Sequence, residues 1–116
     1  MEGFDQMFAE MYASFNERDS DGVLKFMTED VKWPKAFEGG YVIGKDAIKE
    51  YWTRQWEEID PIVTPTGTSV LPDGRVEVTV HQVVRDMAGA VLADMTVLHV
   101  YSFVGDLVSQ MDVIDD

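Results

Sequence analysis

The chain of 116 residues is 46% hydrophobic and 27% charged, the composition of one folded domain, residues 1–116, rather than of a disordered segment. Its formal net charge of −13 argues against nucleic acid and anionic membranes as partners, because both are themselves negative. The absence of cysteine excludes disulfides, thiol nucleophiles and thiolate metal sites. No apolar run approaches the ~20 residues of a membrane span, and the N-terminus lacks a basic signal-peptide start, so we expect a cytoplasmic protein.

Three helices are expected in the first half of the chain. Apolar residues recur at helical spacing from Phe4 to Phe15, which predicts an amphipathic helix that ends within residues 16–19. Ser20-Asp21-Gly22 can cap a short second helix that carries Val23, Leu24 and Met27. A third helix is predicted over residues 45–59, with its apolar face formed by Ile48, Tyr51, Trp52, Trp56 and Ile59.

The rest of the chain favours strands. A polar break at residues 28–30 precedes a brief strand at residues 31–33, and residues 35–44 are expected to form a loop in which Gly39-Gly40 adopt positive φ. Further strands are predicted at residues 62–71 and 75–85, followed by a hairpin at residues 96–114. Helices followed by an antiparallel meander indicate an α+β fold with the helices on one face of the sheet.

The last hairpin brings a histidine close to a carboxylate. A two-residue turn at Gly105-Asp106 would pair Val104 with Leu107, and counting outward places Tyr101 opposite Gln110 and His99 opposite Asp112. Cross-strand partners share a face, so the pair could act as a general acid–base dyad in a pocket. The alternative is a structural His–Asp pair, either on the outer face or buried with its own hydrogen bonds satisfied. A register slip of one residue would separate the two side chains.

The position of His81 has two interpretations. If Gly89 takes the left-handed position of a three-residue loop, Asp86 pairs with Ala90, and Glu77 then faces His99 while His81 faces Met95. His81 would then lie on the pocket side. The apolar stripe Val76, Val78 and Val80 predicts the opposite, since these valines would be expected to pack beneath the helices. A dimer that buries the outer face of the sheet would reconcile the two.

Aromatic side chains are expected to wall an apolar pocket. Trp52 and Trp56 lie one helical turn apart on the same side of the third helix, an arrangement suited to a flat apolar ligand, although each is individually more typical of a core. Strand spacing gives no signature of metal ligands, and neither a serine nucleophile motif nor a phosphate loop is present. The expected ligand contacts are Trp33, Trp52, Trp56, Tyr12, His81, Gln110, Met11 and Phe103.

Several segments together resemble the SnoaL-like branch of the nuclear transport factor 2-like superfamily. They are residues 15–19, 28–33 and 44–48, Tyr51-Trp52 with Trp56, and residues 99–101 followed by 111–113. The resemblance covers nearly the whole chain. It implies three N-terminal helices that close over a curved, mainly antiparallel sheet to leave a conical pocket, and it implies a homodimer.

The resemblance also suggests which residues act. SnoaL-like cyclases place an acidic residue on the last strand, typically after a tryptophan, and Asp112 falls there, after Met111. Ketosteroid isomerase is a poorer match, because its tyrosine, its base and its neutral aspartic acid fall at Met11, near Lys35 and at His99. Steroid isomerisation by that route is therefore not expected.

The leading hypothesis is a cofactor-independent enzyme of cyclase, isomerase or dehydratase type that acts on a small hydrophobic substrate bearing a carbonyl group. Asp112 would move the proton, His99 would be its partner, and Tyr101 would stabilise the developing oxyanion. The alternative is a non-catalytic module of the same fold that binds a similar ligand or serves only for dimerisation.

Overall fold

The computed structural model describes residues 2–35 and 39–115, and three helices lie within these ranges. Helix α1 spans Glu2–Asn16, α2 spans Ser20–Leu24 and α3 spans Lys45–Glu58. All three were predicted, but Asp19 rather than Ser20-Asp21-Gly22 caps α2, through its carboxylate, which accepts from the Gly22 N–H at 3.1 Å. The expected contribution of Phe4 and the loop residues 36–38 lie outside what the structure describes. Within the described ranges, no helix is long and apolar enough to cross a membrane.

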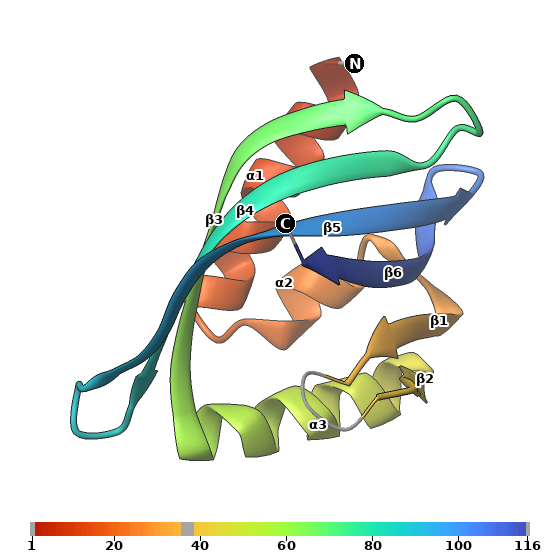
Figure 1. The fold of residues 1–116 in the computed structure, drawn as a ribbon. Coiled ribbons are helices and arrows are strands. Elements are labelled where there is room, and N and C mark those ends of the chain that lie inside the picture. The colour runs from red at the N-terminus through yellow and green to blue at the C-terminus, as the bar shows by residue number, and fades with distance from the viewer. Residues whose placement is uncertain (1, 36–38, 116) are drawn as a thin grey trace.

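Six strands form one sheet in the order β2-β1-β6-β5-β4-β3. Neighbouring strands are antiparallel except β1 and β6, which run parallel. The strands are β1 (Met27–Pro34), β2 (Tyr41–Ile43), β3 (Ile59–Val70), β4 (Val76–Asp86), β5 (Val91–Val104) and β6 (Leu107–Asp115). Figure 1 shows that β3, β4 and β5 are long and curve round the helices, while α3 lies beside β1 and β2. The α+β class is as predicted.

Two details of the first half differ from the prediction. Met27 begins β1 instead of ending the second helix, and the polar residues 28–30 belong to the same strand. The predicted loop contains the short strand β2, which pairs with β1. A strand of three residues is too short to produce a recognisable alternation in the sequence, which explains why it was missed.

The core lies between the helices and the inner face of the sheet. Val76, Val78 and Val80 on β4 are at most 1% exposed and pack in one cluster with side chains of all three helices. The apolar stripe therefore identified the inner face correctly. Asn16, at the end of α1, connects this helix to β3 by two hydrogen bonds. Its side chain donates to the Val63 carbonyl at 2.8 Å and accepts from the Val63 N–H at 2.9 Å.

Single-residue bulges interrupt the pairing of the long strands. The Gly105-Asp106 turn pairs Val104 with Leu107 as predicted, but Phe103 pairs with Val108 and Ser102 with Gln110, which leaves Ser109 unpaired. Leu92 is skipped in the same way between β4 and β5. An extra residue shifts the register by one position, so every side chain beyond it changes face relative to an uninterrupted ladder.

Candidate functional site

A small apolar cavity lies between α1 and the inner face of the sheet. Its volume is about 40 Å³, enough for a few water molecules or for one end of a larger ligand. Helix α1 contributes three of the lining side chains because its apolar positions recur on one face. The lining residues are Met11, Tyr12, Phe15, Val23, Trp33, Val63, His99 and Tyr101.

Three polar side chains at this cavity are linked by hydrogen bonds. The Tyr12 hydroxyl lies 2.8 Å from Nδ1 of His99 and 2.7 Å from the Tyr101 hydroxyl. Tyr12 comes from α1, and the other two residues lie two apart on β5, so they share the inner face. We call Tyr12, His99 and Tyr101 the inner triad. All three side chains are buried, with exposed fractions between 1% and 6%.

Burial keeps the inner triad uncharged. Desolvation lowers the pKa of His99 to about 4, because an imidazolium would lose its hydration in the apolar interior. Desolvation also raises the pKa of Tyr12 and of Tyr101, since a phenolate would lose hydration in the same way. At neutral pH the site therefore holds a neutral imidazole and two neutral phenols.

Two arrangements of the hydrogens use the Tyr12 hydroxyl hydrogen in one of the two hydrogen bonds of the inner triad. In the first, Tyr101 donates to Tyr12 and Tyr12 donates to Nδ1 of His99, so that Nε2 carries the hydrogen. In the second, Nδ1–H donates to Tyr12, Tyr12 donates to Tyr101, and the Tyr101 hydrogen and the Nε2 lone pair are both free. No hydrogen bond to Nε2 is found among the described residues, and the His99 side chain lines the cavity.

Two larger spaces lie beside this cavity and share lining residues with it or with each other. The adjoining one, about 100 Å³, shares Phe15, Trp33, Val63 and His99 with the first and adds the amides of Gln55 and Gln82 to an apolar wall. The next is a hollow of about 510 Å³, which shares Pro34, Gln82, Val84 and Val113 with the second. The space available therefore shrinks in the direction of the inner triad.

The predicted His99–Asp112 dyad is wrong. Val113, not Asp112, lies opposite His99, because the Ser109 bulge shifts β6 by one residue. Asp112 pairs with Val100 on the outer face, where its carboxylate accepts hydrogen bonds from the Tyr41 hydroxyl and, at 3.0 Å, from the Gln110 amide. Gln110 pairs with Ser102 instead of the predicted Tyr101.

His81 also lies on the outer face, and the interpretation that placed it in the pocket is wrong. The predicted Asp86–Ala90 contact is present, with Gly89 at φ 94°, but the skipped Leu92 shifts the following pairs by one. His81 consequently pairs with Thr96, and Val78 takes the predicted place of Glu77 opposite His99. The Nε2 atom of His81 lies 2.6 Å from the Asp94 carboxylate.

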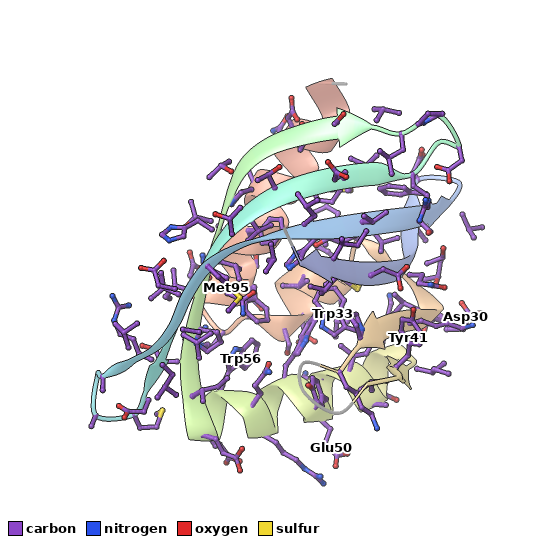
Figure 2. The ribbon with its side chains drawn as sticks, in the orientation of Figure 1. Asp30, Trp33, Tyr41, Glu50, Trp56 and Met95 are labelled. Carbon is purple, nitrogen blue, oxygen red and sulfur yellow. The ribbon has the colours of Figure 1, made fainter. Side chains whose placement is uncertain are left out.

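The three tryptophans have different surroundings. Trp33 lines both inner cavities, whereas Trp52 is completely buried between the rings of Phe15, Trp33 and Trp56 and lines none of the cavities described above. Figure 2 shows Trp56 pointing from α3 towards the sheet, while Glu50 on the same helix points away. Phe103 packs against Phe8 in the core rather than at a cavity.

Sequence reasoning missed part of the lining. Phe15 was assigned to the core of the first helix only, and Val63, Gln55 and Gln82 were not considered. The helical spacing of Met11, Tyr12 and Phe15 was the available signal for one wall. Nothing in the sequence placed β3 against α1. Among the described residues, no group of three or more histidine, aspartate or glutamate side chains is arranged to hold a metal ion.

Solved structures with the same fold come from proteins of low sequence identity. TerC, crystallised with polyporic acid, is 24% identical, with a TM-score of 0.81 over 96% of this chain and 89% of TerC. An NTF2-like protein of Burkholderia pseudomallei, of unknown function, is 23% identical, with a TM-score of 0.81 over 96% and 88%. RV0760c of Mycobacterium tuberculosis, in complex with estradiol-17beta-hemisuccinate, is 16% identical, with a TM-score of 0.77 over 92% and 88%.

A search of curated proteins found no match. The model of the SnoaL-like domain, however, matches residues 8–111, which include α2, α3, every strand except the end of β6, and most of α1. The expected resemblance to SnoaL-like proteins is thus confirmed, and the chain belongs to the SnoaL-like domain family, with the fold of the NTF2-like protein of Burkholderia pseudomallei.

Proposed function

We propose that this protein is a cofactor-independent acid–base enzyme that transfers a proton next to a carbonyl group in a small hydrophobic substrate. The observation that carries the proposal is the inner triad, a buried chain of hydrogen-bonding groups that ends at an apolar cavity. The narrowing spaces would form a conical pocket, with the reacting carbonyl at its closed end. His99 takes the role expected of Asp112, whose carboxylate lies on the other face.

Neutrality of the site limits which proton transfers are feasible. Protonating His99 alone would create a buried imidazolium, and a free enolate would add a buried anion. Both charges are avoided if one proton enters the triad while another leaves it. A base and an acid that act together through a hydrogen-bonded chain meet this condition.

The second arrangement of the triad hydrogens provides such a step. His99 Nε2 removes a proton from the carbon next to the carbonyl, and the electron pair of that C–H bond forms the C=C bond of an enol. The Nδ1 proton passes to Tyr12, the Tyr12 proton to Tyr101, and the Tyr101 proton to the substrate oxygen. Atoms and charge balance, and His99 ends as the Nε2–H tautomer; returning the proton at another atom completes an isomerisation.

A second candidate is a binding protein without catalysis. It is favoured by the same neutrality, because neutral phenols and imidazole also suit a ligand oxygen that only accepts a hydrogen bond. TerC and RV0760c were crystallised with ring compounds that carry oxygen, which supports a ring-containing ligand with oxygen groups for either candidate.

Exchange of carbon-bound hydrogen tests the enzyme without knowledge of the natural substrate. The protein would be incubated in D₂O with 1-tetralone or estrone, two ketones with hydrogens next to the carbonyl, and deuterium uptake followed by mass spectrometry. We expect uptake above background that falls at least 100-fold in His99→Gln, Tyr12→Phe and Tyr101→Phe, the scale of general acid–base catalysis. His81→Gln is the matched control and should exchange normally. Ketone binding without exchange would support the binding protein instead.

The family resemblance also leads us to propose a homodimer through the outer face of the sheet. Leu98 and Ile114 present apolar surface there, and Val100 is only 1% exposed although it belongs to the same face. Light scattering after size-exclusion chromatography should give twice the monomer mass, and Ile114→Lys should reduce it. A monomer at all concentrations would exclude the dimer.

A further inference from the structure

The 510 Å³ hollow has polar groups that the inner cavities lack. Lys35 and Tyr41 line it from the β1–β2 side and Asp112 lines it from β6. The last paired residues of β1 and β6 are Lys32 and Gln110, so beyond them the two strands separate and the inner space opens towards the outer face. Val97 and Val113 on the inner face and Asp112 on the outer face consequently line the same hollow.

The Asp112 carboxylate is held in place at this opening. One oxygen accepts from the Tyr41 hydroxyl and the other accepts from the Gln110 amide at 3.0 Å. Gln110 also lies 3.5 Å from the Tyr41 oxygen, so three side chains from β2 and β6 fix one another. Among the described residues no cation lies within ion-pair distance of Asp112. A carboxylate has about four acceptor positions, and only two are used here.

We propose that Asp112 forms a second recognition site, which binds the hydroxyl group at the far end of an elongated, apolar ligand. This inference rests on the proposed function, since the carbonyl of the same ligand would lie at the inner triad. Trp33, Val84 and Val113 line the space between the two ends and would contact the ligand body. The substrate class is therefore narrowed to ring compounds with a ketone at one end and a hydroxyl group at the other.

The charge around Asp112 favours a ligand group that donates a hydrogen bond over a ligand group that is an anion. Asp112 presents a fixed acceptor, and the net charge of −13 raises the cost of bringing a further anion to the protein. Lys35 lines the same hollow and is the feature that would attract an anionic group instead. The two possibilities make opposite predictions for the same ligand skeleton.

Three estrogens test this choice, because they share a ketone and differ only at the other end. Estrone carries a phenol there, its 3-methyl ether has no donor, and its 3-sulfate is an anion. Binding would be measured through quenching of tryptophan fluorescence, since Trp33 lines the inner cavities. We expect estrone to bind about tenfold or more tightly than the ether, the effect of one hydrogen bond to a charged group, and the sulfate to bind most weakly.

Substitution of the carboxylate identifies its contribution. In Asp112→Ala the ratio of the affinities for estrone and for the ether should fall to about one. If this variant does not fold, Asp112→Asn, which keeps the shape of the side chain, takes its place and should also lower the ratio. Asp94→Ala is the matched control, because this carboxylate is exposed on the outer face and does not line the hollow.

The outcomes separate this inference from the proposed function. Preference for the sulfate, equal binding of estrone and ether, or no binding of any of the three would overturn the hydroxyl site. Hydrogen exchange on 1-tetralone could still occur in each case, because that ketone has no second polar end. Conversely, estrone could bind more tightly than its methyl ether because of Asp112 while no ketone exchanges its carbon-bound hydrogen. That result would support the hydroxyl site and reject the proposed enzyme.

Discussion

The two histidines of the chain lie on neighbouring strands but on opposite faces of the sheet, and their surroundings differ in almost every respect. His99 on β5 faces the helices, is 6% exposed and is hydrogen-bonded to a tyrosine hydroxyl. His81 on β4 faces away, has a side chain that is 48% exposed and contacts a carboxylate. The histidine–carboxylate pair expected in the pocket therefore exists in this protein, but on the other face and with the other histidine.

This difference shows that burial, and not only the neighbouring group, determines the chemistry of a histidine. A carboxylate beside His99 would have favoured the imidazolium, whereas two phenols in a dry cavity favour the neutral ring. The inner face thus suits proton transfer between uncharged groups, and the outer face suits polar contacts that are exposed to solvent. Four substitutions examine this contrast.

The largest effect is expected for Trp52→Ala, on the inner side of the sheet. Trp52 is 0% exposed, and its removal should lower the free energy of unfolding by about 3–5 kcal/mol, the usual cost of deleting a large core ring. Urea denaturation would measure the loss, and His81→Ala on the outer face should cost far less. A small loss combined with weaker ketone binding would mark Trp52 as pocket wall instead.

His99→Gln should change how stability depends on pH. Because the pKa of His99 is lowered from 6.5 to about 4, the unfolded chain binds a proton between these values while the folded protein does not. Stability from this residue is therefore complete above pH 6.5 and falls by about 3 kcal/mol as the pH drops to 4. When the free energy of unfolding is measured by urea denaturation at several pH values, His99→Gln should lose this part of the pH dependence. His81→Gln should keep it. Equal slopes in wild type and His99→Gln would contradict a buried neutral imidazole.

Tyr12→Phe tests the connection between α1 and β5. The substitution leaves both Nδ1 of His99 and the Tyr101 hydroxyl without their partner, which should cost about 1–3 kcal/mol in urea denaturation. Tyr101→Phe breaks one bond rather than two and should cost less. Tyr41→Phe removes one solvent-exposed hydrogen bond on the outer face and, as the comparison, should lower the free energy of unfolding by less than Tyr12→Phe. A reversed order of Tyr12→Phe and Tyr101→Phe would show that Tyr12 is not the central member of the triad.

The smallest effect is expected on the outer face. Asp94→Asn removes the carboxylate from His81, and pairs with this degree of exposure contribute about 0–1 kcal/mol. Thermal and urea denaturation should therefore resemble those of the wild type. A loss above about 2 kcal/mol would indicate that the proposed dimer contact extends from Leu98 and Ile114 as far as this pair, which the concentration dependence of unfolding would test.

The sequence predicted the helices and strands better than the register in which the strands pair. Amphipathic spacing identified α1 and α3, and the glycines of the turns marked the hairpin tips, where Gly89 and Gly105 adopt φ of 94° and 60°. The bulges at Leu92 and Ser109 have no such marker, because neither residue has an unusual backbone preference. Which face a side chain occupies depends on these bulges, so both site assignments based on register were wrong.

Some of the residues that line the candidate site were predicted from the sequence, but the contacts between them were not. His99, Tyr101, Tyr12 and Met11 all line the deep cavity, and each was named from a local pattern. That Tyr12 joins the other two follows from the packing of α1 on the sheet, which brings together residues 87 and 89 positions apart. Contacts at such separation depend on tertiary structure, which no short pattern in the sequence describes.

Ser109 also determines which of two sites this sequence can form. The residue is unpaired, and the ladder beyond it consequently sets Val113 opposite His99 and Asp112 opposite Val100. If Ser109 were instead paired with Ser102, the following pairs would shift by one residue, and Asp112 would lie opposite His99. A change of strand register, without replacement or loss of any residue, thus separates a site of neutral groups from a histidine–carboxylate dyad on the same scaffold.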